Sequence, residues 1–114
     1  MAAVYTSNIV IDSGSDFYQT FSLGDTNTND PLNLTGYSIY SQLRKWSGSS
    51  TAVSFASSVV SSSQGTVSIG LSATASLSLK PGRYVYDILM QDPTGKKTRV
   101  IEGMVLVREG VTKI

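Results

Sequence analysis

The sequence predicts an all-β protein, folded as a single antiparallel β-sandwich of about seven strands over residues 1–114. Apolar and polar residues alternate with a period of two in several short runs, as they do in strands with one buried face. Clusters of Gly, Pro, Asn, Asp and Ser separate these runs, and no long stretch has the period of a helix. With 114 residues, of which 40% are hydrophobic, the chain is long enough to bury one core.

The clearest element is a β-hairpin near the C-terminus. Residues 83–91 and 97–108 are rich in β-branched and aromatic side chains, and Asp92-Pro-Thr-Gly95 separates them. Proline presets φ at the second position of a type I turn, and glycine at the fourth accepts a positive φ. The two runs are therefore predicted to pair as antiparallel strands.

The other elements follow from the same alternation. Residues 4–11 are predicted to form an edge strand or a strand that contacts a partner. In residues 17–23, the side chains of Phe17, Phe21 and Leu23 share one face with Gln19. Further strands are expected at residues 37–46, 53–55 and 67–71, with one helical turn at 74–79 and polar loops at 24–31 and 57–65.

Two tyrosines indicate which type of β-sandwich the chain forms. Gly82-Arg-Tyr-Val-Tyr86 opens a central strand directly after the turn at Lys80-Pro81. In immunoglobulin-type sandwiches, a tyrosine at such a corner bonds through its hydroxyl to the preceding backbone, two residues before an inward core residue. Tyr84 is predicted to be the corner tyrosine and Tyr86 the core residue, which makes the sandwich immunoglobulin-like. Stacking of this pair on a ligand is the alternative.

The strand at residues 37–46 carries a distinctive outer face. Tyr37, Ile39 and Leu43 lie on the inner parity, and the outer parity holds Tyr40, Gln42, Arg44 and Trp46. Aromatic residues with arginine are typical of binding hot spots. Three interpretations stay open: these side chains pack against the second sheet or a long loop, contact a protein partner, or stack on a sugar.

The composition excludes several classes of chemistry. The chain has no Cys and no His, which excludes disulfides, thiolate nucleophiles, imidazole bases and Cys/His zinc sites. Neither phosphate-binding glycine motif occurs, and the net charge of +1 gives little attraction to nucleic acid or anionic lipid. We expect no enzyme activity, no cofactor and no nucleic-acid or membrane partner. Because neither a signal peptide nor a long apolar run is present, we expect a soluble protein made in a cytosol.

Two pairs of carboxylates invite a calcium hypothesis. Asp12 and Asp16 flank a Gly-containing turn, and Asp25 and Asp30 lie in the following loop. Paired carboxylates offer the oxygen ligands that Ca²⁺ prefers, but the spacing of a calcium-binding loop is missing. Acidic turn residues also bond to their own backbone, which is the favoured interpretation.

Charges near the hairpin have simpler interpretations. Asp87 is predicted to face solvent or to pair with a basic neighbour such as Arg99. Lys96, Lys97 and Arg99 could contact phosphate, although charges on an edge strand also discourage aggregation.

Several segments together resemble the small virion proteins of tailed bacteriophages. The chain looks most similar to short structural proteins of marine cyanobacterial phages, and more distantly to N-terminal sandwich modules of baseplate and fibre proteins. The resemblance covers nearly the whole chain and consists of turn and strand motifs: residues 11–17, 32–37, 79–88, Gly95 and residues 100–107. It carries no catalytic residue to transfer.

The resemblance implies a non-enzymatic virion structural protein, assembled in the cytoplasm of a bacterial host. Its expected partners are capsid, neck or tail subunits, in a decoration or accessory role, with self-association in the particle. Residues 1–8 and 108–114 are expected to be arms ordered by a partner. The residues expected to contact partners are Tyr5, Ile9, Tyr40, Arg44 and Trp46. The alternative function is a carbohydrate-binding module for the host surface, with Tyr40 and Trp46 stacking on sugar.

Overall fold

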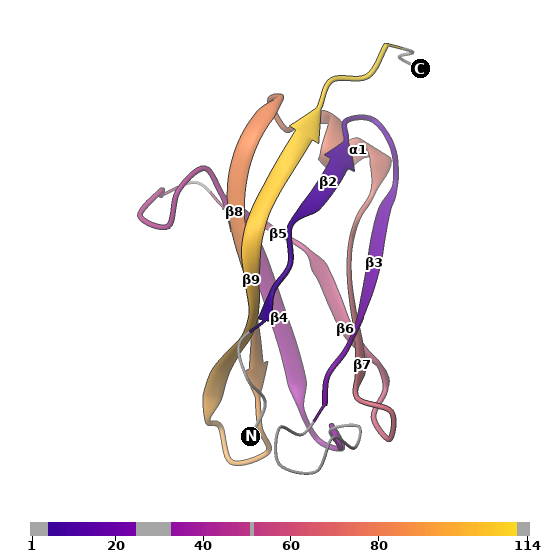
Figure 1. The fold of residues 1–114 in the computed structure, drawn as a ribbon, viewed down its shortest axis with the longest axis vertical. Helices are drawn as coiled ribbons and strands as arrows, with labels where there is room; N and C mark the ends of the chain where they lie inside the picture. Colours follow the sequence, from indigo (N-terminus) through magenta and orange to yellow (C-terminus); the bar gives the residue numbers. More distant parts are fainter. Residues whose placement is uncertain (1–4, 25–32, 51, 112–114) are drawn as a thin grey trace.

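The protein is a two-layer β-sandwich (Figure 1). The computed structural model describes residues 5–24, 33–50 and 52–111, which form nine strands and one short helix. Sheet A contains β1 (Tyr5–Thr6), β2 (Ile9–Asp12), β4 (Ser38–Arg44), β5 (Ala52–Ser54), β8 (Gly82–Gln91) and β9 (Lys97–Arg108). Sheet B contains β3 (Phe17–Ser22), β6 (Ala56–Ser61) and β7 (Thr66–Leu71), and helix α1 spans Ala73–Leu77. The predicted all-β sandwich is confirmed.

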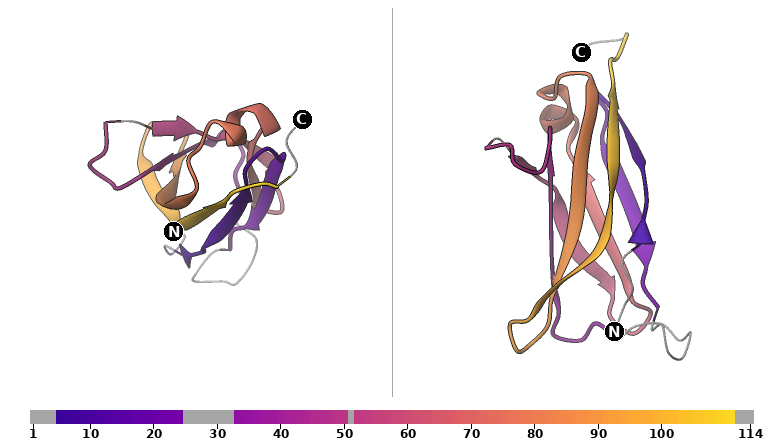
Figure 2. Two further views of the ribbon diagram at one scale, coloured as in Figure 1. Left: turned by 90° about the horizontal axis from the view of Figure 1, so that it is seen from above. Right: turned by 60° about the vertical axis from the view of Figure 1, so that its left-hand side comes forward.

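The order of strands places the hairpin at the centre of sheet A. The order is β1-β9-β8-β4-β5, with β2 also beside β9, and sheet B has the order β3-β7-β6. The core lies between the two layers, which Figure 2 shows from two further directions. Val67 and Ile69 of β7 and Ile88 and Val105 of sheet A are completely buried there. Burial of such side chains is the main stabilising contribution to the fold.

The predicted hairpin is confirmed, and its turn is fixed by one carboxylate. Asp92 Oδ1 accepts hydrogen bonds from the backbone of Thr94 (3.0 Å) and Lys96 (2.9 Å) and from the Thr94 hydroxyl (2.6 Å). Gly95 has φ = 96° and donates its N–H to the Asp92 carbonyl at 3.0 Å. These contacts close the turn and set the register of β8 against β9.

The two tyrosines at the start of β8 have the predicted roles. The Tyr84 hydroxyl donates to the carbonyl of Lys80 at 2.7 Å, as a corner tyrosine does. Tyr86 is buried and meets the ring of Phe55 edge-on, with ring centroids 6.2 Å apart. Both side chains are thus engaged in contacts within the chain.

The N-terminal segment pairs with β9 in two pieces. β1 and β2 both run parallel to β9, with Tyr5 opposite Ile101 and Ile9 opposite Val105. Between them the chain kinks at Ser7, whose N–H bonds to the Glu102 carbonyl at 2.9 Å. Tyr5 and Thr6 of the expected arm 1–8 therefore have backbone partners within the chain, and residues 1–4 lie outside the described residues.

One predicted loop is a strand. Residues 57–65 were expected to be a polar loop, but β6 continues to Ser61 and pairs antiparallel with β7. Of the serine hydroxyls that suggested a loop, that of Ser58 bonds across the sheet to Ser68 at 3.0 Å, and that of Ser57 bonds to the Phe55 carbonyl at 3.2 Å. The predicted strand 37–46 is shorter than expected and ends at Arg44, whereas the helical turn is confirmed at α1. The predicted loop 24–31 lies outside the described residues from Asp25 onward.

Candidate functional site

The outer face of sheet A is the candidate site. It consists of the outward side chains of β2, β4, β8 and β9: Val10, Tyr40, Gln42, Arg44, Val85, Asp87, Leu89, Glu102, Met104 and Leu106. The register joins them across the strands, for example Arg44 opposite Val85 and Val85 opposite Met104. In the part of the chain that the structure describes, no second layer covers this face, because sheet B packs on the other side.

Apolar side chains on this face are unusually exposed. Tyr40 is 51% exposed, Val10 49%, Met104 45% and Leu106 42%. Val10 lies opposite Leu106 in the ladder of β2 and β9, so these two form one apolar strip with Met104. Contiguous exposed apolar surface with a polar rim is characteristic of interaction sites.

A broad hollow of about 900 Å³ lies on this face. Its lining includes Arg44, Trp46, Val85, Asp87, Glu102 and Met104. A smaller hollow of about 300 Å³ continues from Met104 to Leu106, Val10 and Arg83. The face is therefore concave, with one charged part and one apolar part.

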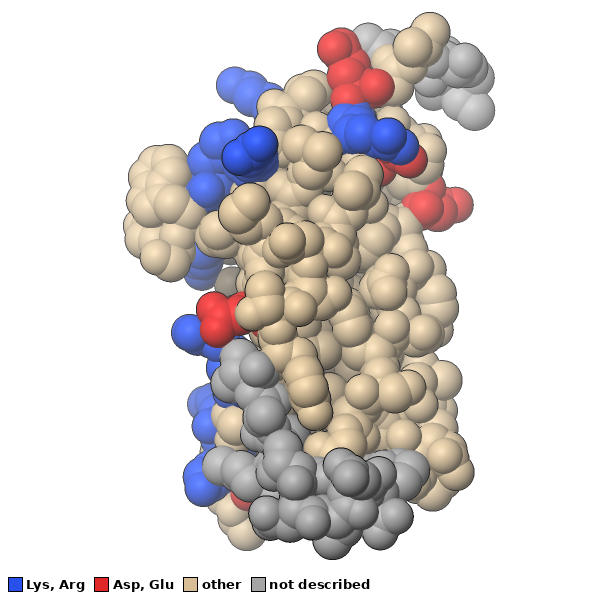
Figure 3. Space-filling view, in the orientation of Figure 1, with Lys and Arg blue, Asp and Glu red and all other residues tan. Residues whose placement is uncertain are grey.

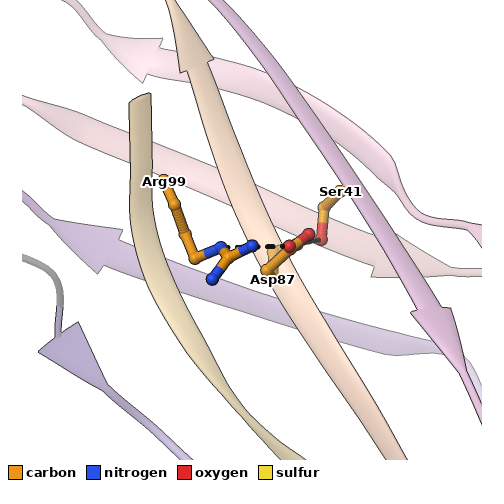
Figure 4. A network of polar contacts seen from close by, with 3 residues as sticks. All are labelled: Ser41, Asp87 and Arg99. Carbon is orange, nitrogen blue, oxygen red and sulfur yellow. Dashed lines mark hydrogen bonds and ion pairs between the residues drawn. The ribbon is translucent and has the colours of Figure 1, made fainter. Parts of the chain in front are cut away.

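An ion pair lies in the charged part (Figure 4). Arg99 Nε lies 3.3 Å from Asp87 Oδ2, which confirms the predicted partner of Asp87. The Ser41 hydroxyl donates to the backbone carbonyl of Asp87 at 2.7 Å from the buried side of the sheet. Glu102 is the cross-strand neighbour of Asp87 and brings a second carboxylate to the same face. Asp87 is already paired with Arg99, so among the described residues Glu102 is the carboxylate on this face that has no ion-pair partner.

Trp46 lies at one rim of the hollow. It follows β4 in a turn where Ser49 N–H bonds to the Trp46 carbonyl at 2.9 Å, and its side chain is 61% exposed. Arg44 fixes this turn, because its guanidinium donates to the Ser49 carbonyl and to Gln42 Oε1 (3.1 Å). Arg44 and Trp46 thus lie together, and the arginine positions the turn that carries the tryptophan.

The five residues expected to contact partners lie in different places. Arg44 and Trp46 share the hollow, and Tyr40 borders another hollow of about 490 Å³ on the β5 side. Tyr5 is 43% exposed in β1 at the edge of sheet A. Ile9 is only 6% exposed and belongs to the core, so it is removed from the set of partner-contacting residues. Its parity in β2 points inward, whereas its neighbour Val10 points outward.

Sequence reasoning missed the apolar strip of Val10, Met104 and Leu106. A usable signal was present, because residues 104–107 are apolar on both parities of one strand. A strand that is apolar on both faces is typical of burial on both faces. Here the inner parity (Val105, Val107) is buried and the outer parity is not covered within the described residues.

The carboxylates that suggested calcium are engaged by the protein itself. Asp12 Oδ1 accepts from Arg108 Nε at 2.7 Å, and this hydrogen bond lowers the pKa of Asp12. Asp16 Oδ1 accepts from the backbone N–H of Ala73 at 2.6 Å, ahead of α1. Within the described ranges, no three acidic side chains gather where they could hold a metal ion. Asp25 and Asp30 lie outside those ranges.

The described residues contain no helix that is long and apolar enough to cross a bilayer.

Comparison with known proteins gives a fold and no family. No family model and no curated protein matches the chain. The N-terminal domain of ORF48 from phage TP901-1 has a similar structure, with a TM-score of 0.54 and 12% identity over 93% of this chain and 97% of that domain. A mutant of the SrpA adhesin from Streptococcus sanguinis gives a TM-score of 0.51 and 13% identity over 89% of this chain. This chain spans only 54% of the adhesin chain. At such identities the likeness shows the β-sandwich fold alone.

Proposed function

We propose that this protein is a non-enzymatic structural component of a phage particle, which docks on neighbouring capsid or tail subunits through the outer face of sheet A. The observation that carries the proposal is the exposed strip of Val10, Met104 and Leu106 beside a hollow bordered by Arg44 and Trp46. A phage context is supported by the similarity in fold to the ORF48 domain of phage TP901-1, which is almost the same size as this chain.

The composition of the face supports docking on a protein. Interface centres are enriched in Trp, Tyr, Met and Arg, and the rim is polar. Here Arg44, Trp46 and Met104 line the same hollow. The Arg99–Asp87 ion pair and Glu102 also lie in that hollow and supply its polar part. A partner that offers an apolar ridge and one cationic side chain next to Glu102 complements this face.

We also propose that the sandwich is of the immunoglobulin type. The corner tyrosine Tyr84 supports this, and so does the hydrogen bond from its hydroxyl to Lys80. The topology supports it too, since a short N-terminal strand runs parallel to the last strand while β3, β7 and β6 form the opposite sheet.

The C-terminal end supports the hypothesis of a partner-ordered arm. β9 ends at Arg108, and the chain then leaves the sheet (Figure 1). Val111 is 99% exposed, although an apolar side chain gains from burial. A partner subunit would supply that burial, and residues 112–114 lie outside the described residues.

The first test is the abundance of the chain in purified phage particles, measured by quantitative mass spectrometry against the major capsid protein. Copies comparable in number to the capsid protein support capsid decoration, and far fewer copies support a neck, tail or baseplate position. Absence from the particles overturns the proposal.

A second test separates protein docking from sugar binding. Met104→Glu and Trp46→Ala are each expected to reduce incorporation into particles, and Val60→Ala is the matched control on the exposed side of sheet B. Both test side chains are exposed, so all three variants should fold. Incorporation that is unchanged in Met104→Glu, together with saturable polysaccharide binding lost in Trp46→Ala, would favour the carbohydrate-binding function instead.

A further inference from the structure

Sheet B ends in an open edge at β3. The order β3-β7-β6 leaves one side of β3 without a strand partner among the described residues. Gln19 lies on the inner parity between Phe17 and Phe21, yet it is exposed, so none of the elements that the structure describes covers it. An open edge presents unpaired N–H and C=O groups and is a template for another strand.

One hydrogen bond shows which N–H and C=O groups of β3 point to the open edge. Leu23 N–H donates to the Gly65 carbonyl at 2.8 Å, which continues the pairing of β3 with β7. Hydrogen-bonded and non-hydrogen-bonded pairs alternate along an antiparallel ladder. Odd-numbered residues of β3 therefore bond to β7, and the N–H and C=O groups of Tyr18, Thr20 and Ser22 point to the open side. Among the described residues, one side-chain contact reaches these groups, the exposed one from Gln19 Nε2 to the Thr20 carbonyl at 3.4 Å.

The other edges of the two sheets are less suited to pairing. β5 has three residues, and β1 and β2 are interrupted at the kink between Thr6 and Ile9. β6 has six residues, but its register shifts between Val59 and Ser61, and such bulges protect an edge. β3 has six residues with unbroken register and contains no charged side chain.

We propose that two copies of this chain pair through β3, antiparallel about a two-fold axis at Thr20. This register places Thr20 opposite Thr20 and Tyr18 opposite Ser22, so that all three outward-pointing residues form hydrogen-bonded pairs. Side chains that face the core in one copy then lie on the same side of the paired strands as the core-facing side chains of the other copy. Sheet B becomes one continuous sheet across both copies. A two-fold contact of this kind is self-complementary and closes on itself.

The distribution of charge also fits a second copy. The surface over most of β3 is free of Lys, Arg, Asp and Glu in Figure 3, and acidic side chains appear only towards the end where α1 lies. In the proposed register, Asp16 faces Gly24 of the other copy. The two Asp16 carboxylates are then about 27 Å apart along the strands, at roughly 3.4 Å per residue, so like charges do not meet.

Cysteine cross-linking tests both the pairing and its register. The chain contains no cysteine, so a single introduced thiol has only its counterpart to react with. In Thr20→Cys the two Cα atoms would be about 5.5 Å apart, which suits a disulfide. In Ser22→Cys, the matched control two residues away on the same face, they would be about 14 Å apart. We expect a disulfide-linked dimer from Thr20→Cys alone.

Sedimentation of the full chain supplies the second measurement. Thr20→Lys places two ammonium groups at the two-fold axis and is expected to raise the Kd of the dimer by about tenfold or more. Val60→Lys adds the same charge to exposed β6 and should leave the Kd unchanged. A wild-type chain that stays monomeric at millimolar concentration overturns the proposal. In that case, a strand of another protein becomes the expected partner of the β3 edge. Equal cross-linking of Ser22→Cys overturns it as well. The docking proposal concerns sheet A and is unaffected by either result.

Discussion

The hydroxyl of Tyr86 donates a hydrogen bond to the backbone carbonyl of Ser7, which lies 79 residues earlier in the chain. Tyr86 faces Gly103 in the pairing of β8 with β9. A Cβ atom at Gly103 would lie 2.2 Å from the Ser7 carbonyl oxygen, so only glycine permits this approach. A core tyrosine and a glycine therefore fix the kink that joins β1 to β2.

Replacing Tyr86 by Phe is expected to destabilise the fold by about 1–2 kcal/mol, because a partly buried carbonyl loses its donor. The measurement is the free energy of unfolding in urea. Tyr84→Phe is the matched control, since the Tyr84 hydroxyl bonds to a more exposed carbonyl that water can reach. A larger loss in Tyr84→Phe than in Tyr86→Phe would contradict this account of the kink.

Burial also predicts how stability depends on alkaline pH. Burial raises the pKa of Tyr86 above its ordinary value of 10.0. Because the folded state favours the neutral phenol, this contribution is fully present below pH 10.0 and is lost as pH rises through the raised pKa. Unfolding midpoints followed across alkaline pH should fall more steeply for the wild type than for Tyr86→Phe. Parallel curves would show that Tyr86 does not carry the effect.

Gly103→Ala is expected to cost about 1–3 kcal/mol, as overpacking in a well-packed interior does. The added methyl group would displace the Ser7 backbone, so exchange of the amide protons of Ser7 and Met104 should also accelerate. Gly48→Ala is the control, because its Cβ would lie 3.4 Å from the exposed Trp46 ring, an ordinary contact. The prediction fails if both variants lose the same stability in urea.

Local signals in the sequence predicted three features: the hairpin, the hydrogen bond of Tyr84 at the corner, and the pairing of Asp87 with Arg99. Each depends on residues within one turn or on two adjacent strands, where turn chemistry and period-2 parity are decisive. The serine-rich strand β6 was missed because its stabilising contact, from Ser58 to Ser68, lies across the sheet. Composition alone cannot distinguish a serine that caps a loop from one that bonds across strands.

The candidate site was predictable only in part, for a related reason. The alternation of side chains along β4 correctly predicted Arg44 on the outer face. It did not predict that β4 ends at Arg44, and a turn after the strand carries Trp46 to the rim of the hollow. The exposure of Met104 and the burial of Ile9 both depend on which strands flank β9. That information lies in the parallel pairing of β2 with β9, which joins the two ends of the chain. No local pattern specifies it.

The turn of the hairpin gives a prediction for acidic pH. The Thr94 hydroxyl lowers the pKa of Asp92 below its ordinary value of 3.8, with further hydrogen bonds from the backbone of Lys96 and Thr94. The charged form is favoured in the folded state, so its contribution is present above pH 3.8 and is lost as pH falls through the lowered pKa. Asp92→Asn keeps an acceptor but removes the charge, and it should be less stable than the wild type at neutral pH.

In strong acid this difference in unfolding free energy should vanish, because Asp92 is then protonated in both states of the wild type. Thr94→Val separates the contributions, since it removes the hydroxyl while it leaves the carboxylate and the backbone donors in place. Titration of the Asp92 carboxyl by NMR should give a higher pKa in Thr94→Val than in the wild type. An unchanged pKa would mean that the backbone donors of the turn, and not the hydroxyl, hold the carboxylate in its charged form.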